Sequence, residues 1–370
     1  MKKKLALLLA LATMSMSVVA CGKKEEKVEE PTPAPVEETE TEETEEPAEV
    51  AEGAIAKIGL GIVGGTNSSK DADGDKAAVA QADISIAAVA FDSEGKIVKI
   101  QIDEAQTKAN FAADNSDADL NPEDTYPTKK VKADEYGMRK ASEIGAEIHE
   151  QYASLEEWCI GKTADEVVNM PVKERDENHI AIPDVPELAS TVTVTIESYQ
   201  AAIAEAWENA VDVQGEAVEL GLGVTTSVAG TPADGDKLAK IQVNTTMSAL
   251  AFDAEGKVVA NIIDVMQLPV NVDAEGKIAE RKDDILTKKE LLEDYGMRKA
   301  SEIGAEWFEQ AASLEEWTIG KTIEEITSMP VKERDENHKN VPDVPELAST
   351  VTITVEGYMA AMEGAATNAK

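Results

Sequence analysis

Hydrophobic and polar positions alternate along several stretches of the chain, which is the pattern of strands with one buried face. Apolar runs that contain glycines, at residues 55–63 and 217–224, predict a first strand in each half of the chain. Residues 79–102 alternate on both sides of the turn Asp92-Ser-Glu-Gly95, which predicts an antiparallel hairpin. Residues 241–263 repeat this arrangement and predict a second hairpin.

A helical spacing of apolar positions follows the first hairpin. It predicts a helix across residues 138–158 that ends near Gly161. The apolar face of this helix consists of Met138, Ala141, Gly145, Ile148, Tyr152 and Leu155. Thr163-Ala-Asp-Glu166 has the spacing of a capping box and predicts a short second helix. Residues 190–196 alternate as a strand, and residues 199–206 end this half with an amphipathic helix.

The second half of the chain repeats the first. Tyr136–Glu147 recurs without change at Tyr295–Glu306, and two further blocks recur at the same offset. These blocks are Met170–His179 with Met329–His338, and Pro183–Thr193 with Pro342–Thr352. So long a period indicates a duplicated domain, because solenoid units are several times shorter. Strands and helices are segregated, so we expect an α+β fold of two tandem copies, each a small antiparallel sheet with packed helices, joined near residues 209–214.

The first residues of the chain have a different character. Met1–Lys4 is basic, and Leu5–Ala12 is apolar but too short to span a bilayer. The sequence Val-Val-Ala-Cys21 resembles the cleavage site of bacterial lipoproteins. The resemblance implies that residues 1–20 are a signal peptide and that Cys21 carries lipid, which anchors the protein in the cell membrane at its extracytoplasmic face. An ordinary secretory signal with a chance cysteine is the alternative.

Charge and composition narrow the function further. Residues 23–52 hold thirteen Glu and three Lys among Pro and Thr, so we expect residues 21–52 to form an extended acidic tether. The 370 residues carry 73 Asp and Glu against 35 Lys and Arg, a formal net charge of -38. This charge excludes nucleic acid as a partner, because a run of phosphates needs cationic groups. Two cysteines exclude a disulfide framework and a four-cysteine metal site.

Several motifs could hold a ligand, but each has a structural interpretation. Gly59-Leu-Gly-Ile-Val-Gly64 spells a dinucleotide fingerprint, yet a polar loop follows it instead of a helix. Asp71-Ala-Asp-Gly-Asp75 lacks the carboxylate that would complete a calcium loop, so we expect a polar turn. Cys159 and His149 are replaced by other residues in the second copy, which favours structural roles for both.

Other residues recur in both copies. We expect His179 and His338 to anchor their loops, because one histidine with flexible carboxylates falls short of a metal ligand set. Trp158 and Trp317 match in position and are predicted to belong to the core. Lys162 and its counterpart in the second copy are expected to cap helix ends. The sequence predicts no catalytic residue, no metal site and no hydrolase or transferase site.

The order of elements in each copy resembles the FMN-binding domain of membrane-attached bacterial flavoproteins. These include flavin-carrying subunits of sodium-pumping quinone reductases and of Rnf complexes. The resemblance is carried by the hairpin Asp92–Ile102 with Gln106-Thr107 after it, by the central helical region, and by Leu188–Thr193 running into a helix. The second copy echoes these features at Asp253–Gln267 and Leu347–Thr352.

The resemblance implies FMN as the cofactor, bound covalently or non-covalently. In the family the third segment reads Ser/Thr-Gly-Ala-Thr-x-Thr/Ser, and its Gly-Ala-Thr threonine can be esterified by the FMN phosphate. Thr191 and Thr350 match this threonine by position, although Ala189 stands where the family has glycine. The residues implied in flavin binding are Ser190, Thr191, Thr193, Ser349, Thr350 and Thr352.

We therefore expect a cell-surface lipoprotein with FMN-binding-like repeats at residues 53–212 and 213–370. Its role is at most that of an extracytoplasmic electron-transfer flavoprotein with a membrane redox partner. A tethered module that captures a small ligand or another surface protein, without redox chemistry, is the alternative.

Overall fold

The computed structural model describes residues 53–177, 179–336 and 338–370. The predicted signal peptide, the lipidation of Cys21 and the acidic tether lie outside these residues. Within the described ranges, no helix combines the length and the apolar composition that crossing a bilayer requires.

Each copy of the duplicated sequence forms an antiparallel sheet. In the first copy, called repeat 1, the strands stand in the order β4-β3-β2-β1, and β7, which crosses the junction between the copies, pairs with β1 at the edge of this sheet. They are β1 (Ile55–Gly65), β2 (Val79–Phe91), β3 (Ile97–Phe111), β4 (Ala118–Asp119) and β7 (Val211–Ala217). The order in repeat 2 is β10-β9-β8. These strands are β8 (Glu219–Thr231), β9 (Ala239–Phe252) and β10 (Val258–Val272). The predicted first strands and hairpins are confirmed.

The hairpin turn of repeat 1 shows why this sequence folds back on itself. The Asp92 carboxylate accepts hydrogen bonds from the amides of Glu94 and Lys96 at 2.9 and 2.8 Å. Gly95 adopts a φ of 80°, a left-handed conformation that glycine reaches without strain. Phe91 pairs with Ile97 beside the turn, the register shifts by one residue, and regular pairing continues from Ala90 with Lys99.

The helices follow the strands in each copy. In repeat 1 they are α1 (Lys129–Lys132), η1 (Ala133–Tyr136), α2 (Ile148–Cys159), α3 (Ala164–Val168) and α4 (Glu197–Glu208). In repeat 2 they are α5 (Lys288–Leu291), η2 (Leu292–Tyr295), α6 (Trp307–Thr318), α7 (Ile323–Thr327) and α8 (Glu356–Thr367). Short strand pairs accompany them, namely β5 (Val172–Lys173) with β6 (Ile182–Pro183) and β11 (Val331–Lys332) with β12 (Val341–Pro342). The α+β prediction and the capping box at Thr163 are confirmed.

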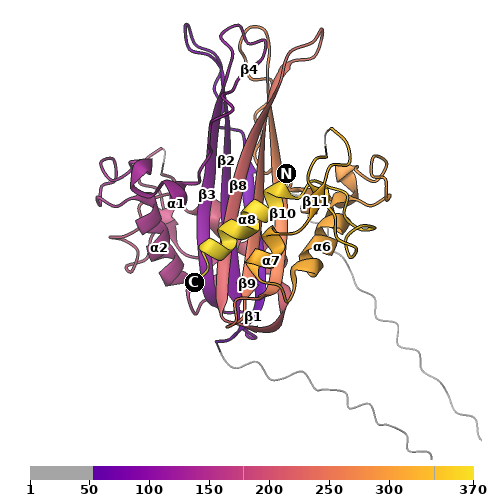
Figure 1. Cartoon of the computed structure of the whole chain (residues 1–370). Coiled ribbons are helices and arrows are strands. Elements are labelled where there is room, and N and C mark those ends of the chain that lie inside the picture. The colour runs from indigo at the N-terminus through magenta and orange to yellow at the C-terminus, as the bar shows by residue number, and fades with distance from the viewer. Residues whose placement is uncertain (1–52, 178, 337) are drawn as a thin grey trace, which may run out of the picture. The chain divides into compact units, whose positions relative to one another are not determined.

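The two sheets pack face to face and share one hydrophobic core. Ile58, Leu60 and Ile62 of β1 are buried in it together with Leu222 of β8 and Met247 of β9. The strands of both repeats therefore stand side by side at the centre of this folded unit, with α8 across one face and other helices at the flanks (Figure 1). The repeats are joined through this core as well as through the chain.

A second core in each repeat lies between its sheet and its helices. Helix α4 packs so closely on β1 that a Cβ atom on Gly61 would lie 1.8 Å from the carbonyl oxygen of Ala202. In repeat 2, a Cβ atom on Gly223 would lie 1.8 Å from the carbonyl oxygen of Ala361 in α8. The glycine run that starts at Gly59 thus permits close contact between strand and helix.

The predicted helix across residues 138–158 is too long. Helix α2 begins only at Ile148, because Gly145 adopts a φ of 67° and breaks the helical backbone before it. The Glu147 carboxylate then accepts a hydrogen bond from the amide of Met138 at 2.8 Å. Residues 138–147 thus fold back as turns onto the N-terminus of α2.

The predicted strand at residues 190–196 is wrong. This segment consists of turns and irregular backbone. The Thr193 amide donates to the Gln151 side-chain oxygen at 2.8 Å, and the Ile196 amide donates to the Ala181 carbonyl at 2.9 Å. Because a helix side chain supplies one of these acceptors, the alternating residues need no neighbouring strand.

Candidate functional site

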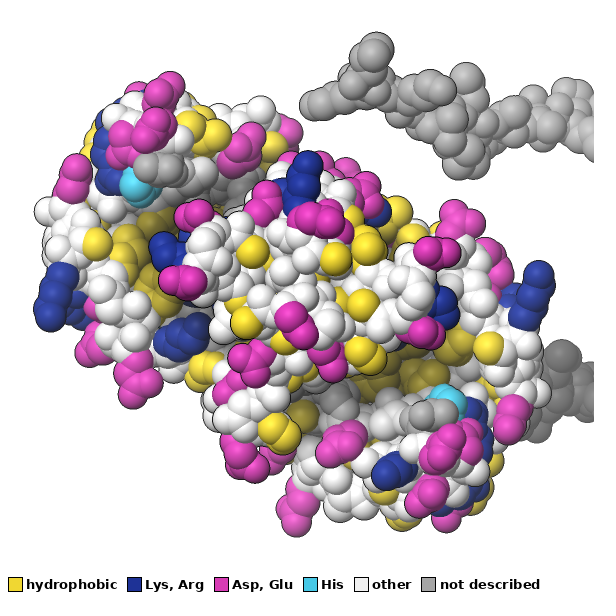
Figure 2. All heavy atoms as spheres, turned by 90° about the horizontal axis from the view of Figure 1, so that it is seen from above, with side chains coloured by type: hydrophobic (Ala, Val, Ile, Leu, Met, Phe, Trp, Pro, Cys, Tyr) yellow, Lys and Arg dark blue, Asp and Glu magenta, His cyan; other side chains and the backbone are white. Residues whose placement is uncertain are grey.

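A cavity of about 640 Å³ lies in repeat 1 between the sheet, α2 and the segment before α4. Its apolar lining includes Tyr136, Met138, Ile148 and Val194. Its polar lining includes Glu104, Gln106, Lys129, Arg175, Thr193 and Thr195. This volume is in the range of cavities that enclose a small organic ligand. Figure 2 shows two hollows with hydrophobic atoms on their floors, each with a histidine beside it.

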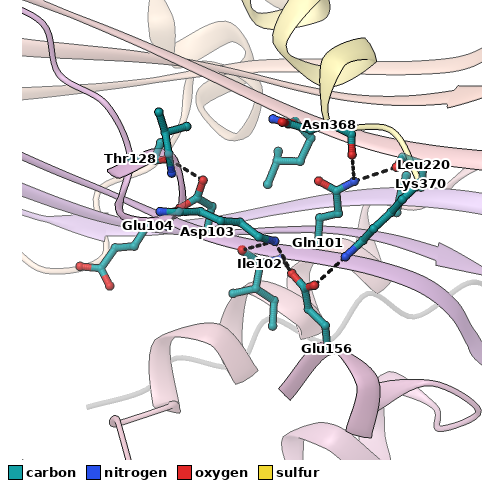
Figure 3. Close-up of polar contacts among 12 residues, drawn as sticks. Gln101, Ile102, Asp103, Glu104, Thr128, Glu156, Leu220, Asn368 and Lys370 are labelled. Atoms are coloured by element: carbon teal, nitrogen blue, oxygen red, sulfur yellow. Dashed lines mark hydrogen bonds and ion pairs between the residues drawn. The ribbon is translucent and has the colours of Figure 1, made fainter. Parts of the chain in front are cut away.

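The backbone around Glu104 and Lys129 is fixed by a neighbouring carboxylate. Asp103 accepts hydrogen bonds from the Thr128 hydroxyl at 2.6 Å and from the Lys130 amide at 3.0 Å. Successive side chains of a strand point to opposite faces, so Glu104 points away from Asp103 (Figure 3). These bonds place α1 against β3 and bring Lys129 to the side of Glu104.

Glu104 is the centre of a largely buried network in the wall of the cavity. Its Oε1 lies 2.6 Å from Lys129 Nζ, and both side chains are only about a tenth exposed. The Tyr199 hydroxyl donates to the Glu104 Oε2 atom at 2.5 Å and lies 2.6 Å from the Tyr152 hydroxyl. The wall therefore presents an ion pair and a phenol held in fixed positions.

Burial and the charge of Glu104 shift the pKa values of the titratable groups in this wall. Burial lowers the pKa of Lys129, but the Glu104 carboxylate outweighs it and leaves this pKa above its ordinary value. Burial, together with the Glu104 charge, raises the pKa of Tyr199 and of Tyr152 well above the usual range. At neutral pH Lys129 is thus charged and both phenols are protonated, so all three groups can donate hydrogen bonds.

Repeat 2 keeps the scaffold of this wall but changes its chemistry. Lys288 and Tyr358 match Lys129 and Tyr199, whereas Val265 stands in place of Glu104. Helix α6 has Ala311 where α2 has a tyrosine, and the indole nitrogen of Trp307 donates to the Tyr358 hydroxyl at 2.8 Å. The tyrosine of each repeat thus keeps an aromatic hydrogen-bond partner, but only repeat 1 keeps the carboxylate.

One loop brings Arg175 and His179 to the same cavity. The Arg175 guanidinium donates to the Thr193 carbonyl at 3.3 Å and pairs with Asp176 at 3.0 Å. His179 Nδ1 lies 2.7 Å from the Asp176 carboxylate, and the corresponding pair of His338 with Asp335 has the same distance. The predicted role of both histidines in anchoring their loops is confirmed.

The predicted flavin-binding residues of repeat 1 lie at different distances from the cavity. Thr193 lines it, and its hydroxyl lies 3.4 Å from the Gln151 side-chain oxygen. Thr191 is not among the lining residues, and its hydroxyl lies 3.5 Å from the Leu188 carbonyl. Ser190 is exposed in the preceding turn.

Repeat 2 arranges its matching segment in the same way. The Thr352 amide donates to the Gln310 side-chain oxygen at 2.8 Å, as Thr193 does in repeat 1. The Thr350 amide donates to the Leu347 carbonyl at 3.1 Å, and Ser349 is exposed. The segment is therefore a helix-anchored turn in both repeats.

Sequence reasoning missed the polar residues of the cavity wall. Glu104 and Tyr199 lie far apart in the chain and belong to no motif. Thr195 also escaped notice. It lines the cavity, and within the described part of the chain its buried hydroxyl has no hydrogen-bond partner. The sequence did offer one indication that Arg175 matters, since this residue belongs to a block that recurs unchanged in repeat 2.

The other motifs have structural roles. Burial raises the pKa of the Cys159 thiol to about 12, which keeps it protonated in the core. Trp158 is only partly buried and packs against the core beneath Lys162, whose ammonium lies 4.1 Å from the ring centre. Lys162 Nζ also donates to the Trp158 carbonyl at 2.6 Å, so the predicted helix cap is confirmed. The Asp71 carboxylate accepts from the Ile278 amide at 2.8 Å.

Among the residues that the structure describes, no group of three His, Cys, Asp or Glu side chains could hold a metal ion.

Comparison with known proteins gives one partial match. The chain is 37% identical over 106 residues to a chlorophenol reductase of Desulfitobacterium hafniense, which covers 26% of this chain and 32% of that protein. The chain thus spans about a third of the length of this curated relative. No protein family and no solved structure matches the chain.

Proposed function

We propose that the protein is a flavin-binding electron carrier, held by lipid at Cys21 on the extracytoplasmic face of a membrane. The observation that carries the proposal is the cavity of repeat 1, because it adjoins the threonine-rich segment that resembles a flavin site. The partial similarity to a reductase supports a redox role. A membrane redox protein would be the partner.

The residues around the cavity fit a flavin. Tyr136, Ile148 and Val194 offer apolar surface for a planar ring system. The buried Thr195 hydroxyl has no hydrogen-bond partner among the residues that the structure describes, so it is available to a ligand. Arg175 supplies a guanidinium, the group that suits a phosphate best.

Residues of the cavity wall would orient this ligand and set its surroundings. A bound flavin supplies the electron-accepting ring, and the protein supplies position and electrostatics. Glu104 and Lys129 present an acceptor and a cation that together add no net charge. Thr193 is placed better than Thr191 to meet the ligand's phosphate, because only Thr193 lines the cavity.

The test is to express the full chain with a flavin transferase and to purify it. We expect the visible absorbance and fluorescence of a flavin. Thr193→Ala should lose the flavin of repeat 1, whereas the matched Thr191→Ala should retain it. Mass analysis after denaturation separates covalent from non-covalent binding. A colourless protein that also fails to bind added FMN overturns the proposal.

A second candidate is a non-redox module that binds a small ligand. Carboxylates already engage Arg175, with Asp176 at 3.0 Å and Glu143 at 3.8 Å, and this leaves less charge for a phosphate. This candidate predicts that the purified chain carries an organic ligand without visible absorbance. Mass spectrometry of the material released on denaturation distinguishes the two.

A further inference from the structure

Lys288 of repeat 2 stands where repeat 1 has an ion-paired lysine, but it lacks the partner. Lys129 lies 2.6 Å from Glu104, whereas the residue that matches Glu104 in repeat 2 is Val265, which is buried and carries no charge. Among the described residues, no hydrogen bond or ion pair of Lys288 Nζ is found; its recorded contacts are the ring faces of Tyr295 at 4.9 Å and Trp307 at 5.4 Å.

This lysine also borders a cavity of its own. A cavity of about 440 Å³ in repeat 2 is lined by Lys288 together with apolar side chains that include Pro269, Ile285 and Leu291. Asp283 and Asp284 belong to the same lining and are exposed. Gln242, Gln267 and Lys282 complete the polar part of the lining. Lys282 is exposed and pairs with Glu280 at 3.0 Å, so Lys288 is the less exposed of the two amines that a small uncharged molecule meets in this cavity.

Burial dominates the titration of this amine. It lowers the pKa of Lys288 to about 8, while the charge of Asp264 opposes this shift. Asp264 is itself buried, accepts hydrogen bonds from the amides of Lys289 and Val265, and has a pKa that burial raises to about 6. With such a pKa roughly a tenth of the amine is uncharged at pH 7, against roughly 0.04% for an ordinary lysine.

We propose that Lys288 is a carbonyl-binding site, at which its uncharged amine condenses with a small neutral aldehyde or ketone in the adjoining cavity. The amine nitrogen forms a bond to the carbonyl carbon, and the carbonyl oxygen leaves as water with both amine hydrogens. The product is an imine, and the step needs no electron donor or acceptor. Desolvated lysines in apolar surroundings are the usual nucleophiles of this reaction.

The inference is independent of flavin binding and is tested on the full chain. The protein is incubated with benzaldehyde near neutral pH, the imine is reduced with borohydride, and labelled lysines are mapped by peptide mass spectrometry. We expect Lys288 to be labelled at least about tenfold more than Lys129, its counterpart, and more than the exposed Lys70.

Two exchanges between the repeats make the test decisive. Val265→Glu gives Lys288 the counter-ion of repeat 1, and its labelling should fall to the level of Lys129. If this variant does not fold, Glu104→Val decides, because it should raise the labelling of Lys129 at least about tenfold. Labelling of Lys288 no stronger than that of Lys70, or labelling that neither exchange alters, overturns the proposal.

Discussion

At the scale of residues, the duplication provides an internal comparison, since near-identical surroundings hold different side chains. The scaffold is kept, as Glu156 and Glu315 each accept a hydrogen bond from a strand amide at 2.7 Å. The wall is not kept, because Glu104 in repeat 1 is Val265 in repeat 2. A buried ion pair costs desolvation, so it adds little stability over an apolar pair, while a lone buried charge is costly.

The exchange at this position should therefore have opposite consequences in the two repeats. Glu104→Val leaves Lys129 without its carboxylate, and we expect the free energy of unfolding to fall by about 2–4 kcal/mol. Val265→Glu gives Lys288 a partner, and its cost should stay within about 1 kcal/mol. Urea unfolding of both variants at neutral pH measures the difference. Equal losses would show that the pairing has no part in stability.

At the scale of elements, the sequence correctly predicted those helices and strands that are set by residues close together in the chain. The hairpins were predictable because alternation and the Asp92–Gly95 turn are local signals. The start of α2 could not be predicted in this way. Residues 138–147 have apolar residues at helical spacing in the sequence, but in the structure they form turns. The segment at residues 190–196 was misjudged because the hydrogen-bond acceptor for Thr193 is Gln151, a distant residue on a helix. The cavity wall could not be predicted for the same reason, because Glu104 and Tyr199 lie far apart in the sequence and come into contact only when the chain folds.

The contact between strand and helix predicts the effect of a single methyl group. Gly61→Ala would place a Cβ atom 1.8 Å from a carbonyl oxygen of α4, so the helix must move. We expect a loss of at least about 3 kcal/mol in the free energy of unfolding. Gly223→Ala should cost a similar amount, since its Cβ atom would lie equally close to α8.

The control for this prediction is Gly357→Ala. Its nearest recorded neighbour is the Thr246 hydroxyl at 3.7 Å, an ordinary contact, and the position lies in the first turn of α8. There alanine should be neutral or should stabilise by up to about 1 kcal/mol. Thermal or urea unfolding of the three variants decides; a Gly61→Ala protein as stable as the wild type contradicts the close packing.

At the scale of the whole folded unit, the repeats are bound to each other by more than their shared core. The Gln101 side chain of β3 donates to the carbonyls of Leu220 and Asn368 in repeat 2, at 2.8 and 2.7 Å (Figure 3). Lys370 pairs with Glu156 of repeat 1 at 2.7 Å. We therefore expect the two repeats to unfold together in one transition, because neither can expose its inner face alone.

The junction between the repeats also carries an acidic group that should make this transition depend on pH. Glu205 of α4 accepts a hydrogen bond from the Ile62 amide at 3.2 Å and lies near the carboxylates of Glu290 and Asp264. Burial, and then the charge of Glu290, raises the pKa of Glu205 to about 8. The folded protein thus holds this proton more tightly than the unfolded chain, where the pKa is about 4.3.

Because the pKa of Glu205 is higher in the folded protein, the free energy of unfolding should decrease as the pH rises. The stabilisation by the bound proton is complete below about pH 4.3 and is lost as the pH rises through about 8. Since Glu205 is partly exposed, we expect a loss of about 1–3 kcal/mol between pH 5 and pH 9. Glu205→Gln keeps the acceptor for Ile62 and should remove most of this loss, whereas Glu208→Gln, on the exposed side of α4, should not. Urea unfolding across this pH range is the measurement, and parallel pH profiles for wild type and Glu205→Gln would show that the junction holds Glu205 ionised in the folded state.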